Sequence, residues 1–143
     1  MLLISHRGNL EGPHLEQENS PPYVESALKQ GFDVEVDVWY VNGGLFLGHD
    51  MPEHEIEKEF LMNTGLWCHA KNIETLEFLM DNNIRCFWHQ TDDVALTYPD
   101  MFLWTFPNKK LTERSICVHL GRKETEIGDC FGICSDYIES FRK

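Results

Sequence analysis

Short apolar segments recur along the chain, separated by polar segments that carry the signals of helix ends. Seven of them have the length and the β-branched or aromatic content of strands: Leu2–Ser5, Phe32–Val38, Leu66–Ala70, Ile84–His89, Met101–Phe106, Ser115–Leu120 and Cys130–Ser135. Alternating strands and helices are typical of parallel β/α units, so the pattern predicts an α/β fold.

Three of the intervening segments indicate helices. Ser20 can cap a helix that starts at Pro21 and ends at Gly31. Asn72 can cap a second helix with four apolar side chains on one face: Ile73, Leu76, Leu79 and Met80. The segment Glu53–Met62 is acidic at its start and apolar at its end, which indicates a short third helix.

Strand spacing limits the architecture. The dipeptide Asn42-Gly43 predicts a hairpin between Val38–Val41 and Leu45–Gly48. Beyond Ile84 the strand starts lie only about 14 to 18 residues apart, which leaves room for helices of one or two turns. We therefore expect one domain over residues 1–143, a trimmed TIM-like (β/α) barrel of about seven parallel strands with short or missing later helices. An open doubly wound sheet is the alternative.

Composition excludes several classes of protein. The chain has 12 Lys and Arg against 24 Asp and Glu, a net charge of −12, which disfavours nucleic acid and anionic membranes as partners. No apolar run approaches the ~20 residues of a membrane span, and the first residues lack the basic and apolar regions of a secretory signal. The 5 cysteines lack metal-site spacing and indicate free thiols, so we expect a cytoplasmic protein.

Polar side chains gather at the ends of the predicted strands. Glu35 and Asp37 lie two apart among valines, so both face one side of their strand. Two such carboxylates repel each other unless a positive group lies between them, and a hard divalent cation is the simplest one. An edge strand that turns the pair to solvent is the alternative. Other strand ends carry further polar residues: His6, His49, Asp50, His69, Lys71 and His89.

Each of these histidines and the lysine, taken alone, is more typical of a hydrogen-bonded or ion-paired structural residue. Their joint occurrence at strand ends indicates one site. Five of these residues, His6, Glu35, Asp37, His49 and Asp50, lie in three motifs: Ser5-His6-Arg7-Gly8, Glu35-Val36-Asp37-Val38 and Gly44-Leu45-Phe46-Leu47-Gly48-His49-Asp50. Two further motifs accompany them: Glu18-Asn19-Ser20 and Gly132-Ile133-Cys134-Ser135-Asp136-Tyr137. In order and spacing the chain resembles the glycerophosphodiester phosphodiesterase family, within the phospholipase-C-like phosphodiesterase superfamily. The resemblance is specific over residues 5–50 and weaker over 72–129.

The resemblance implies a fold, a reaction and roles for individual residues. Members of the family have a TIM-like barrel and hydrolyse small-molecule phosphodiesters with a divalent metal, commonly Mg²⁺ or Ca²⁺. By resemblance His6 and His49 are the general acid and base, with their order left open. Arg7 and Lys71 would bind the phosphate, which suits a guanidinium because it can make two parallel hydrogen bonds.

Metal binding by Glu35 and Asp37 is also implied by the resemblance, and here the sequence departs from the family. The family has a third acidic ligand in an E-x-K motif, where this chain has His69-Ala70-Lys71. An imidazole can still bind a metal, but it favours Mn²⁺, Fe²⁺ or Zn²⁺ over Ca²⁺. The alternative is that metal binding and catalysis have been lost. Three further residues are expected to support the site: Glu18, Asp50 and His89.

Two other functions stay open. A non-catalytic descendant of the family would bind a phosphorylated metabolite or a protein partner without turnover. A metal-binding or storage protein would use His69 and His89 beside the two carboxylates. A barrel this short can also leave an open seam, which a second copy of the chain would cover in a homo-oligomer.

Overall fold

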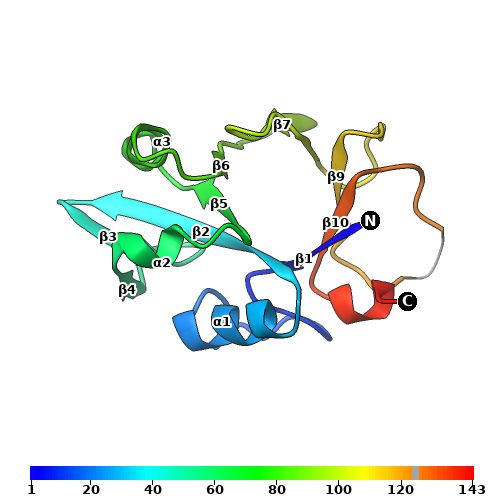
Figure 1. Cartoon of the computed structure of the whole chain (residues 1–143), viewed down its shortest axis with the longest axis horizontal. Coiled ribbons are helices and arrows are strands. Elements are labelled where there is room, and N and C mark those ends of the chain that lie inside the picture. The colour runs from blue at the N-terminus through cyan, green and yellow to red at the C-terminus, as the bar shows by residue number, and fades with distance from the viewer. Residues whose placement is uncertain (124–125) are drawn as a thin grey trace.

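One curled sheet dominates the structure (Figure 1). The computed structural model describes residues 1–123 and 126–143. The strands are β1 Leu2–His6, β2 Asp33–Val41, β3 Gly44–Leu47, β4 His54–Ile56, β5 Leu66–Ala70, β6 Cys86–Phe87, β7 Val94–Leu96, β8 Leu103–Thr105, β9 Ser115–Val118 and β10 Gly132–Ser135. Their order is β4-β3-β2-β1-β10-β9-β8-β7, and β5 pairs with both β2 and β6. A backbone bridge between Cys86 and Tyr98 joins β6 to the segment that follows β7.

Few helices accompany this sheet. They are α1 Pro21–Lys29, α2 Lys58–Leu61, α3 Ile73–Asp81 and a 3-10 helix, η1 Ile138–Phe141. Two predicted helices are confirmed: Pro21 begins α1, and the Asn72 side chain accepts a hydrogen bond from the Thr75 N–H at the start of α3. In the part of the chain that is described, no helix is both long and apolar enough to cross a membrane.

The prediction of a trimmed TIM-like (β/α) barrel is wrong. The sheet is mixed, because β3, β4 and β7 pair antiparallel with their neighbours. Only α1 and α3 connect adjacent parallel strands in sequence, and no α-helix stands between β8, β9 and β10 among the described residues. A helix needs an apolar face to bury, and the polar segments around β9 offer none.

Most of the predicted strands are confirmed, with shorter bounds late in the chain. The hairpin is confirmed too: Asn42 and Gly43 adopt positive φ values of 51° and 77° between β2 and β3. The helix predicted over Glu53–Met62 is wrong in its first half, which forms β4, and only α2 remains. Strand β7 and helix η1 were not predicted.

The two faces of the sheet have different contents. Val34, Val36 and Val38 of β2 pack against α1 and α3. The opposite face, inside the curl, holds a second apolar cluster that includes Ile4 and Trp104. Because side chains alternate along a strand, the residues between the β2 valines also point into the curl. This arrangement places the acidic residues of β2 above an apolar interior.

Candidate active site

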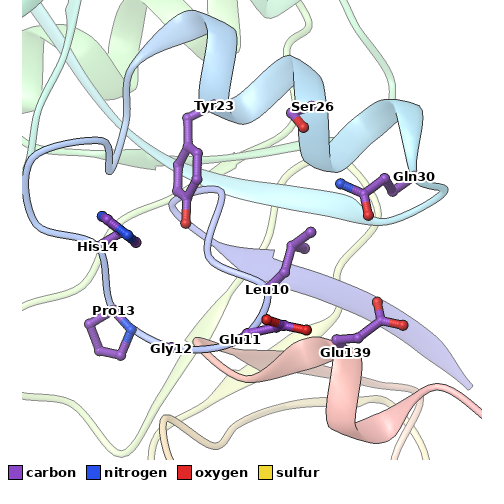
Figure 2. A pocket seen from close by; sticks show the side chains of 9 residues that line it. All are labelled: Leu10, Glu11, Gly12, Pro13, His14, Tyr23, Ser26, Gln30 and Glu139. Carbon is purple, nitrogen blue, oxygen red and sulfur yellow. The ribbon is translucent and has the colours of Figure 1, made fainter.

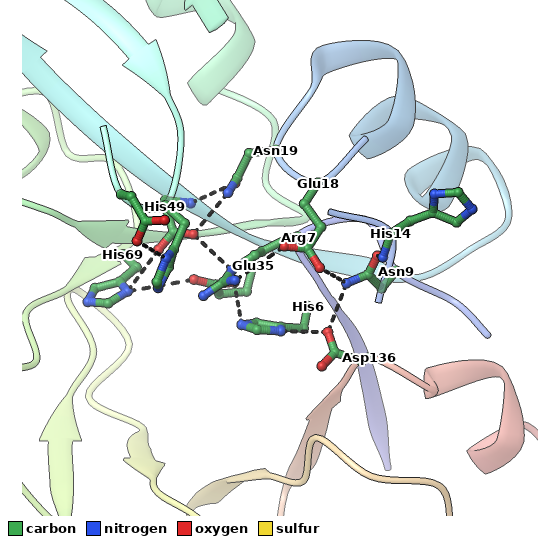
Figure 3. A network of polar contacts seen from close by, with 12 residues as sticks. His6, Arg7, Asn9, His14, Glu18, Asn19, Glu35, His49, His69 and Asp136 are labelled. Carbon is green, nitrogen blue, oxygen red and sulfur yellow. Dashed lines mark hydrogen bonds and ion pairs between the residues drawn. The ribbon is translucent and has the colours of Figure 1, made fainter. Parts of the chain in front are cut away.

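Three neighbouring parallel strands bring the predicted residues together. In the register of β1, β2 and β5, His6 lies beside Glu35 and Asp37 lies beside His69. Figure 3 shows His6, Glu35 and His69 pointing toward the same space. The sequence-based prediction that the two carboxylates share a face with valines opposite is confirmed.

The carboxylates are buried and surrounded by cationic side chains. Glu35 is 3% exposed and Asp37 is 0% exposed. His69 Nδ1 lies 3.1 Å from Asp37 Oδ1 and 3.8 Å from Glu35 Oε1. Arg7 Nε lies 3.0 Å from Asp37 Oδ2, and Lys71 Nζ lies 3.5 Å from Asp37 Oδ1. The positive charge expected beside the carboxylates is therefore supplied in part by protein side chains.

These neighbours separate the pKa values of the two carboxyl groups. Burial opposes the ionisation of Asp37, but the hydrogen bond from His69 and the charges of Arg7 and Lys71 outweigh it and lower the pKa of Asp37. Burial and the negative charge of Asp37 raise the pKa of Glu35. Asp37 is thus stable as an anion, whereas Glu35 needs a further cation.

Glu35, Asp37 and His69 fit a divalent metal. One ligand atom from each lies within 4.8 Å of the others. Glu35 Oε2 is buried without a hydrogen-bond partner among the described residues. Buried carboxylate oxygens normally have partners, and a cation between these groups would provide one. Two carboxylates and one imidazole suit Mn²⁺, Fe²⁺ or Zn²⁺ better than Ca²⁺.

His6 is oriented by the last strand of the sheet. A hydrogen bond of 2.7 Å joins His6 Nδ1 to Oδ1 of Asp136, which follows β10, and leaves Nε2 3.7 Å from Glu35 Oε2. Burial lowers the pKa of His6, but the bond to Asp136 and the charge of Glu35 outweigh it, so the net shift is upward. This geometry fixes which ring nitrogen faces the cavity.

Arg7 links the carboxylate of Asp37 to that of Glu18. Arg7 adopts a positive φ of 57°, which turns its side chain toward Asp37. Its Nη1 also lies 3.3 Å from Glu18 Oε2. Glu18 is buried and reaches the carboxylate of Asp37 through Arg7; its supporting role stays a prediction.

Two asparagines complete the site, and sequence reasoning gave neither of them a role. Asn9 is fully buried and donates hydrogen bonds of 2.8 Å to both Glu18 and Asp136. Asn19 donates to Asp37 Oδ2 and accepts from the Asp37 backbone N–H. Asn19 stood inside a recognised motif, whereas Asn9 lies in a loop with no periodic pattern that would indicate burial.

The remaining predicted residues lie at the rim. His49 is 46% exposed and its Nδ1 lies 2.8 Å from Oδ1 of the exposed Asp50. His89 stacks on Phe106 with a centroid distance of 3.6 Å and lies 6.0 Å from the His69 ring. His89 therefore borders the metal cluster without joining it in the described structure.

A cavity of about 220 Å³ unites these groups. It is lined on one side by polar residues from the early strands: His6, Arg7, Glu35, His49 and His69. A candidate cation site, two imidazoles and a guanidinium in one cavity can bind a phosphate and transfer protons. No protein-family model, curated protein or solved structure matches the chain, so this function is argued from the site alone.

A larger cavity of about 630 Å³ lies behind the loop that carries Asn9, between α1 and η1 (Figure 2). Glu11, His14, Tyr23 and Glu139 are among its lining residues, and none of the three candidate metal ligands is. We take the smaller cavity as the candidate active site because the buried titratable groups meet there. Two lining residues of the larger cavity reach that network: the Tyr23 hydroxyl and the His14 backbone N–H both donate to Asn9 Oδ1.

Removing the Asn9 side chain should destabilise the protein. Asn9→Ala removes the buried amide donor that Glu18 and Asp136 share, so we expect a loss of about 2 kcal/mol in the free energy of unfolding. Urea denaturation at pH 7 measures it. Gln17→Ala, at an exposed position of the same loop, is the matched control and should change stability by less than about 0.5 kcal/mol. Equal stability of both variants would contradict the role of Asn9.

Proposed function

We propose that the chain is a metal-dependent phosphoric diester hydrolase that acts on a glycerophosphodiester-like compound. One observation carries the proposal: His6, held by Asp136, faces Glu35 at the edge of a buried cluster whose donor set fits a divalent cation. A structural ion-pair network does not require a buried carboxylate oxygen without a hydrogen bond, such as Glu35 Oε2, beside an oriented imidazole.

Charge neutralisation is the first task in this reaction, because a phosphodiester anion repels nucleophiles. A metal held by Glu35, Asp37 and His69 would act as a Lewis acid on the phosphoryl oxygens. Arg7 lines the same cavity, and its guanidinium can donate to a phosphate oxygen. Lys71 adds positive charge through its contact with Asp37.

Proton transfer is the second task. The raised pKa of His6, which the bond to Asp136 and the charge of Glu35 produce, favours the protonated ring as general acid for the leaving alkoxide. His49, whose Nδ1 is held by Asp50, would then take the proton of the attacking hydroxyl. That hydroxyl can belong to water or to the substrate itself.

The second candidate is a non-catalytic protein that binds a phosphorylated metabolite. Its supporting observation is that Arg7, His69 and Lys71 already surround Asp37 and offset its charge without a metal. This candidate predicts ligand binding without turnover under any divalent metal.

We also propose that the protein works in a reducing compartment such as the cytoplasm. All five cysteines are free. Burial raises the pKa of Cys86 to about 12, so this thiol stays protonated and unreactive.

Metal preference tests the assignment of His69. We expect Mn²⁺ to stabilise the metal-free protein by about 2.7 kcal/mol at a hundredfold excess over Kd, and Ca²⁺ to stabilise it less. His69→Glu should reverse this order, because three carboxylates suit Mg²⁺ and Ca²⁺. Thermal unfolding with each metal in turn measures both effects, and hydrolysis of bis(p-nitrophenyl) phosphate in the same samples reports turnover.

His54→Glu is the matched control for that experiment, since His54 lies on β4 outside the cluster. This variant should keep the order of the natural sequence, in which Mn²⁺ stabilises the protein more than Ca²⁺ does. A shared order in all three proteins would show that His69 is not a ligand. Metal binding without turnover would favour the non-catalytic candidate.

A further inference from the structure

The cavity that contains the candidate metal ligands has a second wall of different chemistry. This apolar wall consists of residues of β6, β8 and β9 and residues just after β8 and β9: Phe87, Trp104, Phe106, Val118 and Leu120. The His89 ring stacks on it. Of the described residues on this side, none is acidic. A phosphodiester bound between Arg7 and His6 would therefore extend one substituent over carbon surface.

Aromatic stacking makes this wall continuous. The Phe87 and Trp104 rings stack with centroids 4.4 Å apart, and the His69 ring stacks on Phe87 at 5.0 Å. Phe106 stacks on His89 and remains half-buried, with one part facing the cavity. Phe87 and Trp104 are almost fully buried, so Phe106 is the ring with surface left for a ligand.

We infer that the substituent bound in this cavity is an uncharged planar ring attached to the phosphoryl group. This inference rests on the proposed function. His89 Nδ1 is buried without a hydrogen-bond partner among the described residues and could bond one hydroxyl. A substituent with several hydroxyls would still lose water here without enough hydrogen-bond partners. A quaternary ammonium group would find aromatic faces but no carboxylate on this wall. Ring stacking on Phe106 satisfies both constraints. The volume of about 220 Å³ is adequate, since apolar cavities of about 150 Å³ already hold benzene.

Three phosphonates test the inference without turnover, because the P–C bond resists hydrolysis. They carry the same phosphoryl group with a phenyl, a 2-hydroxyethyl or a 2-(trimethylammonio)ethyl substituent. In calorimetric titrations with Mn²⁺ present, we expect phenylphosphonate to bind about tenfold more tightly than either of the others. Phe106→Leu keeps an apolar side chain but removes the ring, and it should reduce this preference to about twofold.

Phe131→Leu is the matched control. Phe131 is half-exposed, packs on Phe102 and does not line the cavity, so its loss should leave the preference intact. Equal affinities for the three phosphonates would overturn the ring inference and leave the phosphate site standing. Tightest binding of the ammonium compound would overturn it in favour of cation recognition. No binding of any phosphonate would overturn both the inference and the proposed function.

Discussion

Replacing His6 by alanine should lower the rate of phosphodiester hydrolysis by about 10³-fold while the protein stays folded. The imidazole lines the cavity, and its bond to Asp136 fixes its orientation. Its loss removes the proton that the leaving alkoxide needs. The kcat for bis(p-nitrophenyl) phosphate with saturating Mn²⁺ measures the effect, and thermal unfolding of the same sample verifies the fold.

His54→Ala controls for the loss of an imidazole. His54 lies on β4, and its Nε2 is 3.8 Å from Oε2 of the exposed Glu53. We expect its kcat to stay within about twofold of the natural sequence, because its side chain does not line the cavity. Full activity in His6→Ala, with a folded protein and bound metal, would remove His6 from the mechanism.

Local periodicity explains why part of the site could be predicted from the sequence. Glu35 and Asp37 share a face because a strand repeats every two residues, and that period is visible in the sequence. The pairing of β1 with β2 and of β2 with β5 then places His6 and His69 beside them. The hydrophobic alternation of the sequence therefore predicts both strand β2 and the face of that strand on which Glu35 and Asp37 lie.

Long-range contacts explain what could not be predicted. His6 and Asp136 are 130 residues apart, and their bond depends on the pairing of the first strand with the last. Asn9 lies in a loop, and the path of that loop depends on tertiary contacts that the local sequence does not show. Strands β4 and β7 are three residues long, too short for a periodic signal, and their antiparallel pairing turns the expected barrel into a mixed sheet.

The two carboxylates of β2 should respond in opposite directions to amide substitution in the metal-free protein. The lowered pKa of Asp37 means that its anion stabilises the fold above its ordinary pKa of 3.8, and that this stability is lost as pH falls through the lower folded value. At pH 7, Asp37→Asn should therefore cost about 3 kcal/mol, because Arg7 and Lys71 lose their partner.

Glu35 has a raised pKa, so its contribution to stability changes with pH in the opposite direction. The protonated form stabilises the fold below its ordinary pKa of 4.5, and this stability is lost as pH rises through the higher folded value. At pH 7 the buried anion opposes folding, and Glu35→Gln should stabilise the metal-free protein by about 1 kcal/mol. Urea denaturation in the presence of a chelator, repeated across pH 4 to about pH 8, measures both variants.

Addition of Mn²⁺ then separates a folding role from a binding role. The natural sequence should gain stability when Mn²⁺ binds. Neither amide variant should, because each replaces one of the two charged carboxylate ligands by a neutral amide. If Glu35→Gln instead weakens the metal-free protein, Glu35 serves as the structural partner of His6 and His69, and the metal site loses its main support. A carboxylate that lowers the stability of the empty protein but is required for its stabilisation by metal is best explained by selection for binding the cation.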